Sequence, residues 1–282
     1  MDSNTIDLKL PAIVFTDLDG TLLDHNNYDW LPARATLNSL AAINIPVIFN
    51  TSKTRAELEY WRNEIGNQHP FITENGSAIF IPTGYPEVET GSGQYDIIEL
   101  GVKRTEIRAW LQQHGSAFQD HFVSFAELSP SELIQLTDLP ESQAEMALKR
   151  EYSEAIHWHG DENLRTSFIN RVKESGYQVL IGGRFLHILG NTNKGKAAQT
   201  LLSVLQNHYS IFDTDSGNHS KVSTIACGDS QNDIDMLNWA DVAIVIRSPK
   251  NPTPPINNPI FIISHATGPS GWAEAFQMLT FK

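Results

Sequence analysis

The chain has 282 residues and a formal net charge of −13, from 20 Lys and Arg against 33 Asp and Glu. This acidity argues against a nucleic-acid partner and against binding to an anionic membrane, because both require a basic face. The single cysteine excludes a disulfide framework, and without long apolar runs or a basic leader we expect no membrane span and no signal peptide. The sequence predicts a cytoplasmic globular protein of one large or two modest domains.

The first third of the chain alternates predicted strands and helices. Short apolar runs predict buried strands, and apolar residues at helical spacing predict helices between them. The strands are expected at 12–15, 45–49 and 71–73, and the helices at about 32–42 and 54–65. Thr54 and Glu57 have the spacing of a capping box at the start of the second helix. This order predicts a Rossmann-like, doubly wound α/β sheet of mostly parallel strands, which binds ligands beyond its carboxyl ends.

The middle of the chain differs in character. A stretch rich in Pro and Gly at 82–93 is followed by mixed signals for strands and helices. The expected elements are a strand at 95–100, a helix around 107–111, a helical region at 130–151, and a hairpin formed by 177–181 and 184–188. We therefore predict an inserted α+β module, with boundaries 84–189, that acts as a substrate-specificity cap.

The α/β pattern returns after the insert. A helix is predicted at about 194–205, and buried strands at 222–227 and 242–246. The catalytic core is therefore expected to be discontinuous, comprising residues 1–83 and 190–282. The inserted module would then lie over the edge of the sheet where the strands end.

The sequence Asp17-Leu18-Asp19-Gly20-Thr21 directly follows the first predicted strand. In extended backbone, carboxylates two residues apart point to the same side, which brings both to the edge of the sheet. One carboxylate can attack phosphorus to form an aspartyl-phosphate, and the other can act as general acid and base. Two acids beside a phosphate need a divalent cation, and Mg²⁺ suits carboxylate oxygens. The alternative is a structural turn rich in Asp and Gly.

Two further positions can hold a phosphate group. Thr51 follows the second strand and offers a hydroxyl and a backbone N–H, although Thr in such a place also caps helices. Lys194 can pair with the phosphate and the nucleophile. Residues 190–196 also have the spacing of a P-loop, but Ala197 stands where that loop needs Ser or Thr, which disfavours ATP binding. Solvated lysines at a helix start are the structural alternative.

Residues 228–233 read Gly-Asp-Ser-Gln-Asn-Asp and follow another buried strand. Asp229 is the expected metal ligand at this strand end, with Asp233 close by in the first turn of a helix. Ser230 and Asp233 also have capping-box spacing, which would give the second carboxylate a structural use.

Three other features have structural interpretations. Residues 213–217 resemble the start of a calcium loop, but its twelfth position is Thr224 rather than Glu. Cys227 lies within an apolar strand and is expected in the core. His157 and His159 have the two-residue period of a half-exposed strand, which we favour over a metal site.

The four motifs, in this order on alternating strands, resemble those of the haloacid-dehalogenase superfamily, and the insert resembles its type-two (C2B) cap. Further segments are similar to the mannosyl-3-phosphoglycerate phosphatases: Glu-Asn-Gly at 74–76, Arg-Glu-Tyr-Ser-Glu at 150–154, Gly-Gly-Arg-Phe-Leu-His at 182–187 and Gly-Pro-Ser-Gly-Trp at 268–272. The resemblance covers essentially the whole chain. It implies a Mg²⁺-dependent phosphatase that converts mannosyl-3-phosphoglycerate to mannosylglycerate, a compatible solute, and phosphate.

Residue by residue, the resemblance implies Asp17 as nucleophile and Asp19 as general acid and base. Thr51 and Lys194 would hold the transferring phosphate, and the metal site would comprise Asp17, Asp19, Asp229 and Asp233. Glucosyl-3-phosphoglycerate and other sugar phosphates, such as sucrose phosphate, are alternative substrates. A phosphosugar mutase and a non-catalytic binding protein are alternatives with the same motifs.

The expected partner is a small anionic sugar phosphate, and the expected assembly is a monomer or a homodimer. Arg150 and Arg184 carry guanidinium forks suited to a carboxylate or a phosphate, although both could equally be surface residues. The predicted substrate-binding residues are Leu18, Ser52, Lys53, Asn75, Arg150, Glu151, Tyr152, Arg184 and Asn232.

Overall fold

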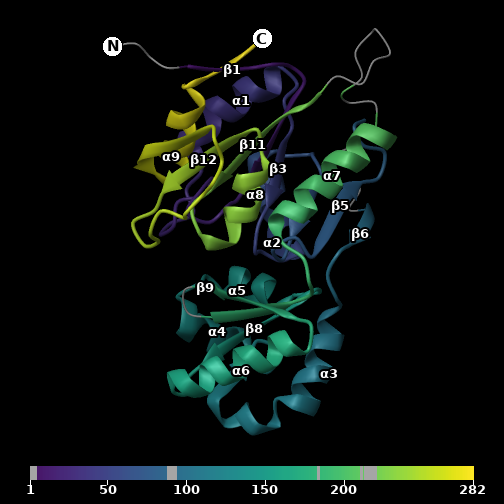
Figure 1. Ribbon diagram of the computed structural model, residues 1–282, viewed down its shortest axis with the longest axis vertical. Coiled ribbons are helices and arrows are strands. Elements are labelled where there is room, and N and C mark those ends of the chain that lie inside the picture. Colours follow the sequence, from purple (N-terminus) through teal and green to yellow (C-terminus); the bar gives the residue numbers. More distant parts are fainter. Residues whose placement is uncertain (1–4, 88–93, 183–184, 210–211, 213–220) are drawn as a thin grey trace.

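The computed structural model describes residues 5–87, 94–182, 185–209, 212 and 221–282. Arg184 and the segment 213–217 lie outside these residues. The described part of the chain forms two domains (Figure 1). The larger domain carries both ends of the chain, and the smaller domain lies at the end of the larger one that is opposite to them. Within it, no helix is long and apolar enough to cross a membrane.

An eight-stranded sheet forms the centre of the larger domain, in the order β13-β12-β11-β2-β3-β4-β5-β6. Pairing is parallel from β13 to β4, and β5 and β6 are added antiparallel. The strands are β2 (Ala12–Thr16), β3 (Val47–Asn50), β4 (Phe71–Thr73), β5 (Ala78–Pro82), β6 (Tyr95–Glu99), β11 (Ser223–Gly228), β12 (Val242–Arg247) and β13 (Phe261–Thr267). The predicted mostly parallel sheet is confirmed. Its strands read as apolar runs because both faces are covered.

Two apolar clusters lie on the two faces of this sheet, as a doubly wound fold requires. One contains Val14 and Phe49 with residues of α1 (Arg34–Ala42), α2 (Arg55–Ile65) and α9 (Gly268–Phe276). The other contains Ile13 and Ile48 with residues of α7 (Lys194–His208) and α8 (Ile234–Trp239). Neighbouring strand residues thus point to opposite layers. Cys227 is fully buried in the first cluster, as predicted.

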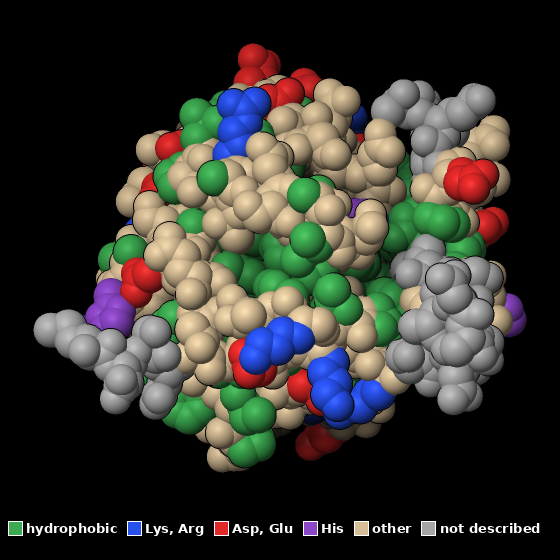
Figure 2. Space-filling view, turned by 90° about the horizontal axis from the view of Figure 1, so that it is seen from above, with side chains coloured by type: hydrophobic (Ala, Val, Ile, Leu, Met, Phe, Trp, Pro, Cys, Tyr) green, Lys and Arg blue, Asp and Glu red, His purple; other side chains and the backbone are tan. Residues whose placement is uncertain are grey.

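Short elements complete the larger domain. A 3₁₀ turn, η1 (Leu31–Ala33), leads into α1, and η4 (Gln231–Asp233) leads into α8. Strand β1 (Ile6–Leu8) pairs in parallel with β14 (Leu279–Phe281), which brings the two ends of the chain together. Figure 2 looks onto this end of the molecule, where apolar side chains gather in the centre of the view. The carboxyl ends of the parallel strands lie at the opposite end, toward the smaller domain (Figure 1).

The smaller domain, here called the cap domain, is built on an antiparallel sheet of order β7-β8-β10-β9. Its helices α3 and α6 pack on one face and α4 and α5 on the other. The elements are α3 (Arg104–His114), η2 (Ser116–His121), β7 (Phe122–Ser124), α4 (Pro130–Thr137), α5 (Glu141–Leu148), β8 (Ser153–Trp158), α6 (Glu162–Glu174), β9 (Gln178–Gly182) and β10 (Phe185–Leu189). An α+β module within the core chain was predicted for this part.

The position of β6 corrects one expectation. Its residues were predicted to belong to the insert, but β6 pairs antiparallel with β5, with Pro82 opposite Tyr95, and so extends the large sheet. The turn-rich stretch at 82–93 therefore joins two strands of one sheet. Residue 84 is too early as a domain boundary, since the chain enters the cap domain only after Glu99.

Candidate active site

Four loops meet at the carboxyl edge of the large sheet, after β2, β3, β4 and β11. A buried capping box holds the loop after β3, because Thr54 Oγ1 accepts from the Glu57 backbone and the Glu57 carboxylate accepts from the Thr54 backbone. The spacing of these two residues predicted this cap. The loop delivers Thr51, Ser52 and Lys53 to the same edge as Asp17.

Asp17, Asp229 and Asp233 form a compact cluster of carboxylates. One oxygen from each lies within 4.8 Å of the others, and all three residues are buried. Gly20 makes the approach possible, because its φ is +79° and a Cβ atom there would lie only 2.8 Å from Asp229 Oδ2. Two conditions therefore favour glycine at position 20: the positive φ of its own turn and the close approach of Asp229 from the loop after β11.

Lys194 neutralises part of this charge. Its Nζ lies 2.6 Å from Asp17 Oδ1 and 2.7 Å from Asp233 Oδ1, and its side chain is completely buried. Burial alone would lower the pKa of Lys194, but the two adjoining carboxylates outweigh it and raise that pKa above its ordinary value. The ammonium is therefore kept charged. Lys196, the lysine of the P-loop spacing, is exposed and donates to Asn191.

The carboxylates still outnumber the one ammonium in direct contact with them. Burial raises the pKa of Asp17 to about 8; Lys194 opposes this, while the charges of Asp233, Asp229 and Asp19 add to it. Burial, with the charge of Asp233, raises the pKa of Asp229 to about 6, against a hydrogen bond from Asn251. A buried group of oxygen donors with excess negative charge fits a hard divalent cation.

The spacing of Asp233 allowed either a structural role in a capping box or a place beside the metal site, and the residue has contacts of both kinds. Its Oδ2 accepts from the backbone N–H groups of Asp229 and Ser230, which completes the capping box, while Oδ1 accepts from Lys194. One carboxylate thus fixes the start of η4, the loop that carries Asp229, and the lysine. This leaves Asp233 less free than Asp229 to bind a cation directly.

Asp19 lies apart from the carboxylate cluster, with its side chain 34% exposed. Its Oδ1 is 2.9 Å from Nζ of Lys53, which also faces Glu57 and lies 5.1 Å from the ring centre of Tyr28. The neighbouring carboxylates of Asp19 and Glu57 raise the pKa of Lys53 despite its burial. A carboxylate held by an ammonium at the opening of the site can reach a leaving group or a water molecule, as a general acid and base must.

The predicted substrate-binding residues other than Ser52 and Lys53 lie in different parts of the structure. Asn75 and Asn232, 157 residues apart in sequence, are hydrogen bonded through Asn232 Nδ2 and Asn75 Oδ1 at 2.9 Å. Leu18 is completely buried in the core, so only its backbone can meet a ligand. Arg150, Glu151 and Tyr152 lie where the cap domain meets the core. Arg184 lies outside the described residues.

Sequence reasoning missed several residues that arrange this site. Asn50 Nδ2 donates to the Lys194 carbonyl, and Asn251 Nδ2 donates to Asp229 Oδ2. Glu74 joins the core to the cap domain. Asn50 had its position at a strand end as a sequence signal, and Glu74 also lay in the family-like segment 74–76, but neither signal gave a role in the site. Asn251 lies in a loop that had no such signal.

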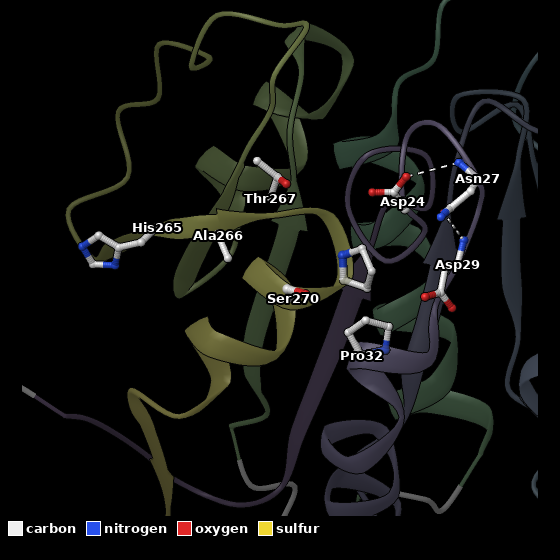
Figure 3. A pocket seen from close by; sticks show the side chains of 9 residues that line it. Asp24, Asn27, Asp29, Pro32, His265, Ala266, Thr267 and Ser270 are labelled. Carbon is white, nitrogen blue, oxygen red and sulfur yellow. Dashed lines mark hydrogen bonds between the residues drawn. The ribbon is translucent and has the colours of Figure 1, made fainter.

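A cavity of about 420 Å³ lies beside the active edge but excludes its reacting residues. It opens between the loop after β2 and the start of α9, where Asp24 and Asn27 face Thr267 and Ser270 (Figure 3). Asp24 Oδ1 accepts from the Asn27 backbone, and such turn-forming hydrogen bonds explain its polar wall. None of the residues that line this cavity belongs to the carboxylate cluster.

The chain matches a model of the haloacid dehalogenase-like hydrolases over residues 14–251. A glucosyl-3-phosphoglycerate/mannosyl-3-phosphoglycerate phosphatase of Methanococcoides burtonii is 37% identical over 276 residues, covering 96% of this chain and 97% of that protein. A mannosyl-3-phosphoglycerate phosphatase of Pyrococcus horikoshii is 34% identical, covering 85% and 92%. A haloacid dehalogenase-like hydrolase from B. subtilis superposes with a TM-score of 0.63 at 15% identity, covering 94% and 98%. The chain belongs to the haloacid dehalogenase-like hydrolases.

Proposed function

We propose that this protein is a Mg²⁺-dependent phosphatase of hexosyl-3-phosphoglycerates, with the mannosyl ester as the first candidate and the glucosyl ester as the second. The contact of Lys194 with both Asp17 and Asp233 is the observation that carries the chemistry, because it sets a charged group beside a buried nucleophile. The substrate class rests on relatives more than 30% identical over most of the chain, whose names include one or both esters.

The proposed reaction has two steps. A carboxylate oxygen of Asp17 attacks phosphorus, the bond from phosphorus to the ester oxygen breaks, and Asp19 gives a proton to that oxygen. Asp19 then takes a proton from water, the water oxygen attacks phosphorus, and the bond to Asp17 breaks to release phosphate. Thr51 and Lys194 would hold the transferring group in both steps, and Lys194 would offset its developing charge.

Asp17, Asp229 and the backbone of Asp19 would hold the Mg²⁺ ion, with Asp233 at its margin. The fit follows from the donor set, which is a buried cluster of carboxylates with a surplus of negative charge. When bound, a divalent cation supplies charge neutralisation that lets an anionic phosphate approach two acids. The chain itself orients these carboxylates: Gly20 leaves room for Asp229, Asn251 donates to Asp229, and Lys194 pairs with Asp17.

The long-range field of this acidic chain repels an anionic substrate, so local cations must reverse it. Lys53 and Lys194 lie at the edge of the large sheet that faces the cap domain, and Arg150 reaches the loop after β3 from the cap domain. Arg184, which lies outside the described residues, would add a guanidinium fork for the glycerate carboxylate. Asn75, Asn232 and Ser52 would supply polar contacts to the phosphate or the sugar.

The test is phosphate release with Mg²⁺ from mannosyl-3-phosphoglycerate, glucosyl-3-phosphoglycerate and sucrose 6-phosphate, with Asp17→Asn as the blank. We expect a preference of about tenfold or more in kcat/KM, or about 1.4 kcal/mol, for one of the phosphoglycerate esters over sucrose 6-phosphate. Equal and feeble rates on all three would overturn the substrate assignment and keep the phosphatase chemistry. Turnover by the Asp17 variant near that of the wild type would overturn the mechanism.

A further inference from the structure

The turn at residues 74–77, between β4 and β5, is bound to the loop that carries Thr51. The Glu74 N–H donates to the Lys53 carbonyl at 3.0 Å, and the Asn75 N–H donates to the Thr51 carbonyl at 2.9 Å. Glu74 and Asn75 both have positive φ, 48° and 60°, which non-glycine residues seldom adopt. Two successive residues in this conformation are held there by the surrounding contacts.

The same turn touches the loops that carry Lys194 and Asp229. Gly76 lies so close to the chain before α7 that a Cβ atom would be 2.3 Å from the Asn193 carbonyl oxygen. Thr192 Oγ1 donates to the Gly76 carbonyl, and Asn232 Nδ2 donates to Asn75 Oδ1. One short turn therefore contacts three loops: the loop after β3, the loop after β11, and the segment before α7 by which the chain returns from the cap domain.

The Glu74 side chain points the other way, into the cap domain. Its Oε1 accepts from the Glu151 N–H at 2.8 Å, both oxygens accept from the Tyr152 N–H at 3.3 and 3.2 Å, and Oε2 accepts from Ser153 Oγ. The side chain is only 1% exposed. A buried carboxylate with this many donors is a strong and directional contact.

Arg150 completes the contact from the cap side. Its Nη2 donates to the Ser52 carbonyl at 2.8 Å, its Nε donates to Ser153 Oγ at 2.9 Å, and the same Nε lies 3.5 Å from Glu74 Oε2. Its side chain is 4% exposed, and its guanidinium donates to partners in both the core and the cap domain. Arg150 thus fastens the cap domain to the loop between Thr51 and Lys53.

These contacts form a third crossing between the domains, besides the two covalent connections at 100–103 and 190–193. Two polar side-chain contacts across the boundary are more open: Glu99, which accepts from Tyr152 Oη, has a side chain that is 45% exposed, and the Arg55–Glu151 pair is 39% and 35% exposed. Ion pairs in such exposed positions contribute little. The Glu74–Arg150 contact, with the hydrogen bond from buried Thr54 Oγ1 to the Met146 carbonyl, is therefore a buried anchor of the cap domain.

We propose that Glu74 and Arg150 are positioning residues that set the cap domain over the phosphate-holding loops. The carboxylate of Glu74 holds the start of β8, and its backbone holds the loop after β3. One residue therefore fixes the position of the cap domain relative to the loop that carries Thr51. The inference rests on the proposed function, since a hexosyl ester would be gripped between the two domains. A substrate too small to reach the cap domain needs only the loops, whose backbone contacts do not depend on the carboxylate.

The test compares Glu74→Gln with the wild type on mannosyl- or glucosyl-3-phosphoglycerate and on p-nitrophenyl phosphate. The amide keeps the size of the side chain but turns an NH₂ group toward the donors of residues 151–153. We expect kcat/KM for the hexosyl ester to fall by about tenfold or more, mainly through KM, and kcat/KM for the aryl ester to change by less than about threefold. Glu99→Gln, the exposed carboxylate that also contacts Tyr152, is the matched control and should leave both unchanged.

Hydrogen exchange gives a readout that does not depend on the substrate. The amides of residues 151 and 152 should exchange about tenfold faster or more in Glu74→Gln than in the wild type and Glu99→Gln. Arg150→Lys, which keeps the charge but not the fork, should show the same two effects more weakly and stands in if the Glu74 variant does not fold. Unchanged exchange with equal losses on both esters would overturn the inference. A wild type that cleaves only the aryl ester while exchange responds as expected would overturn the proposed function and leave the anchor standing.

Discussion

The ammonium of Lys194 lies 2.6 Å from Oδ1 of Asp17, and both side chains are buried although 177 residues separate them. The lysine opens α7, where the chain re-enters the core from the cap domain, and the aspartate directly follows β2 at the centre of the sheet. Because the cap domain is inserted between them, this contact joins the two sequence segments of the discontinuous core. Asp17 is thus held by the first core helix after the cap domain.

Lys194→Met should remove turnover and weaken the fold. The loss of a charged donor aimed at the transferring phosphate predicts a fall of about 10²–10³ in kcat. Removing one partner of a buried ion pair also leaves carboxylates uncompensated, at a cost of about 3–5 kcal/mol in the free energy of unfolding. Phosphate release and urea unfolding measure the two effects. Lys196→Met, two residues away but exposed, should change neither, and a fully active Lys194 variant would contradict the assigned role.

Asp19→Asn should impair sugar esters more than aryl esters. Asparagine cannot give a proton to the leaving alkoxide, whereas p-nitrophenolate leaves without one, so we expect losses of about 10²–10⁴ in kcat/KM for the hexosyl ester and smaller losses for the aryl ester. Asp24→Asn is the control, because Asp24 lies in the same loop and asparagine can keep its turn contacts. Equal losses on both esters would mean that Asp19 does not protonate the leaving group.

Much of this arrangement could be predicted from the sequence because it is local. Short apolar runs ending in Asp17 or Asp229 mark buried strands and their loops, and the Thr54–Glu57 spacing marks a helix start. The role of Glu74 could not be predicted, since its partners lie 77 to 79 residues away in the other domain. The sequence also did not show that β6 belongs to the eight-stranded sheet rather than to the cap domain. An antiparallel edge strand has the same local pattern whichever sheet it joins.

Mg²⁺ should raise the melting temperature of the wild type but not that of Asp229→Asn. A cation that binds only the folded chain adds RT ln(1 + [Mg²⁺]/Kd), which is about 2.7 kcal/mol at a concentration 100 times Kd. EDTA should stop phosphate release, and added Mg²⁺ should restore it. Asp241→Asn is the matched control, because Asp241 pairs with Lys221 and Thr224 away from the carboxylate cluster. Activity that survives thorough chelation would refute a metal requirement.

His69 should make the fold sensitive to mild acid. Burial, with the nearby charge of Arg62, lowers the pKa of His69 from 6.5 to about 4, and its Nδ1 is hydrogen bonded to the Tyr85 hydroxyl at 3.1 Å. Between these pH values the unfolded chain binds a proton that the folded chain does not. The contribution of His69 is therefore fully present above pH 6.5 and is lost as the pH falls toward 4, by at most about 3 kcal/mol.

His69→Gln tests this linkage, because glutamine is neutral throughout and can still reach the Tyr85 hydroxyl. The free energy of unfolding, measured by urea at pH 7.5 and pH 4.5, should fall less for the variant than for the wild type. His208→Gln, at the exposed end of α7, should follow the wild type and controls for losing any histidine. The two variants should differ because burial lowers the pKa of His69 in the folded chain. Parallel pH profiles for the wild type and His69→Gln would mean that His69 accepts a proton without disturbing its surroundings.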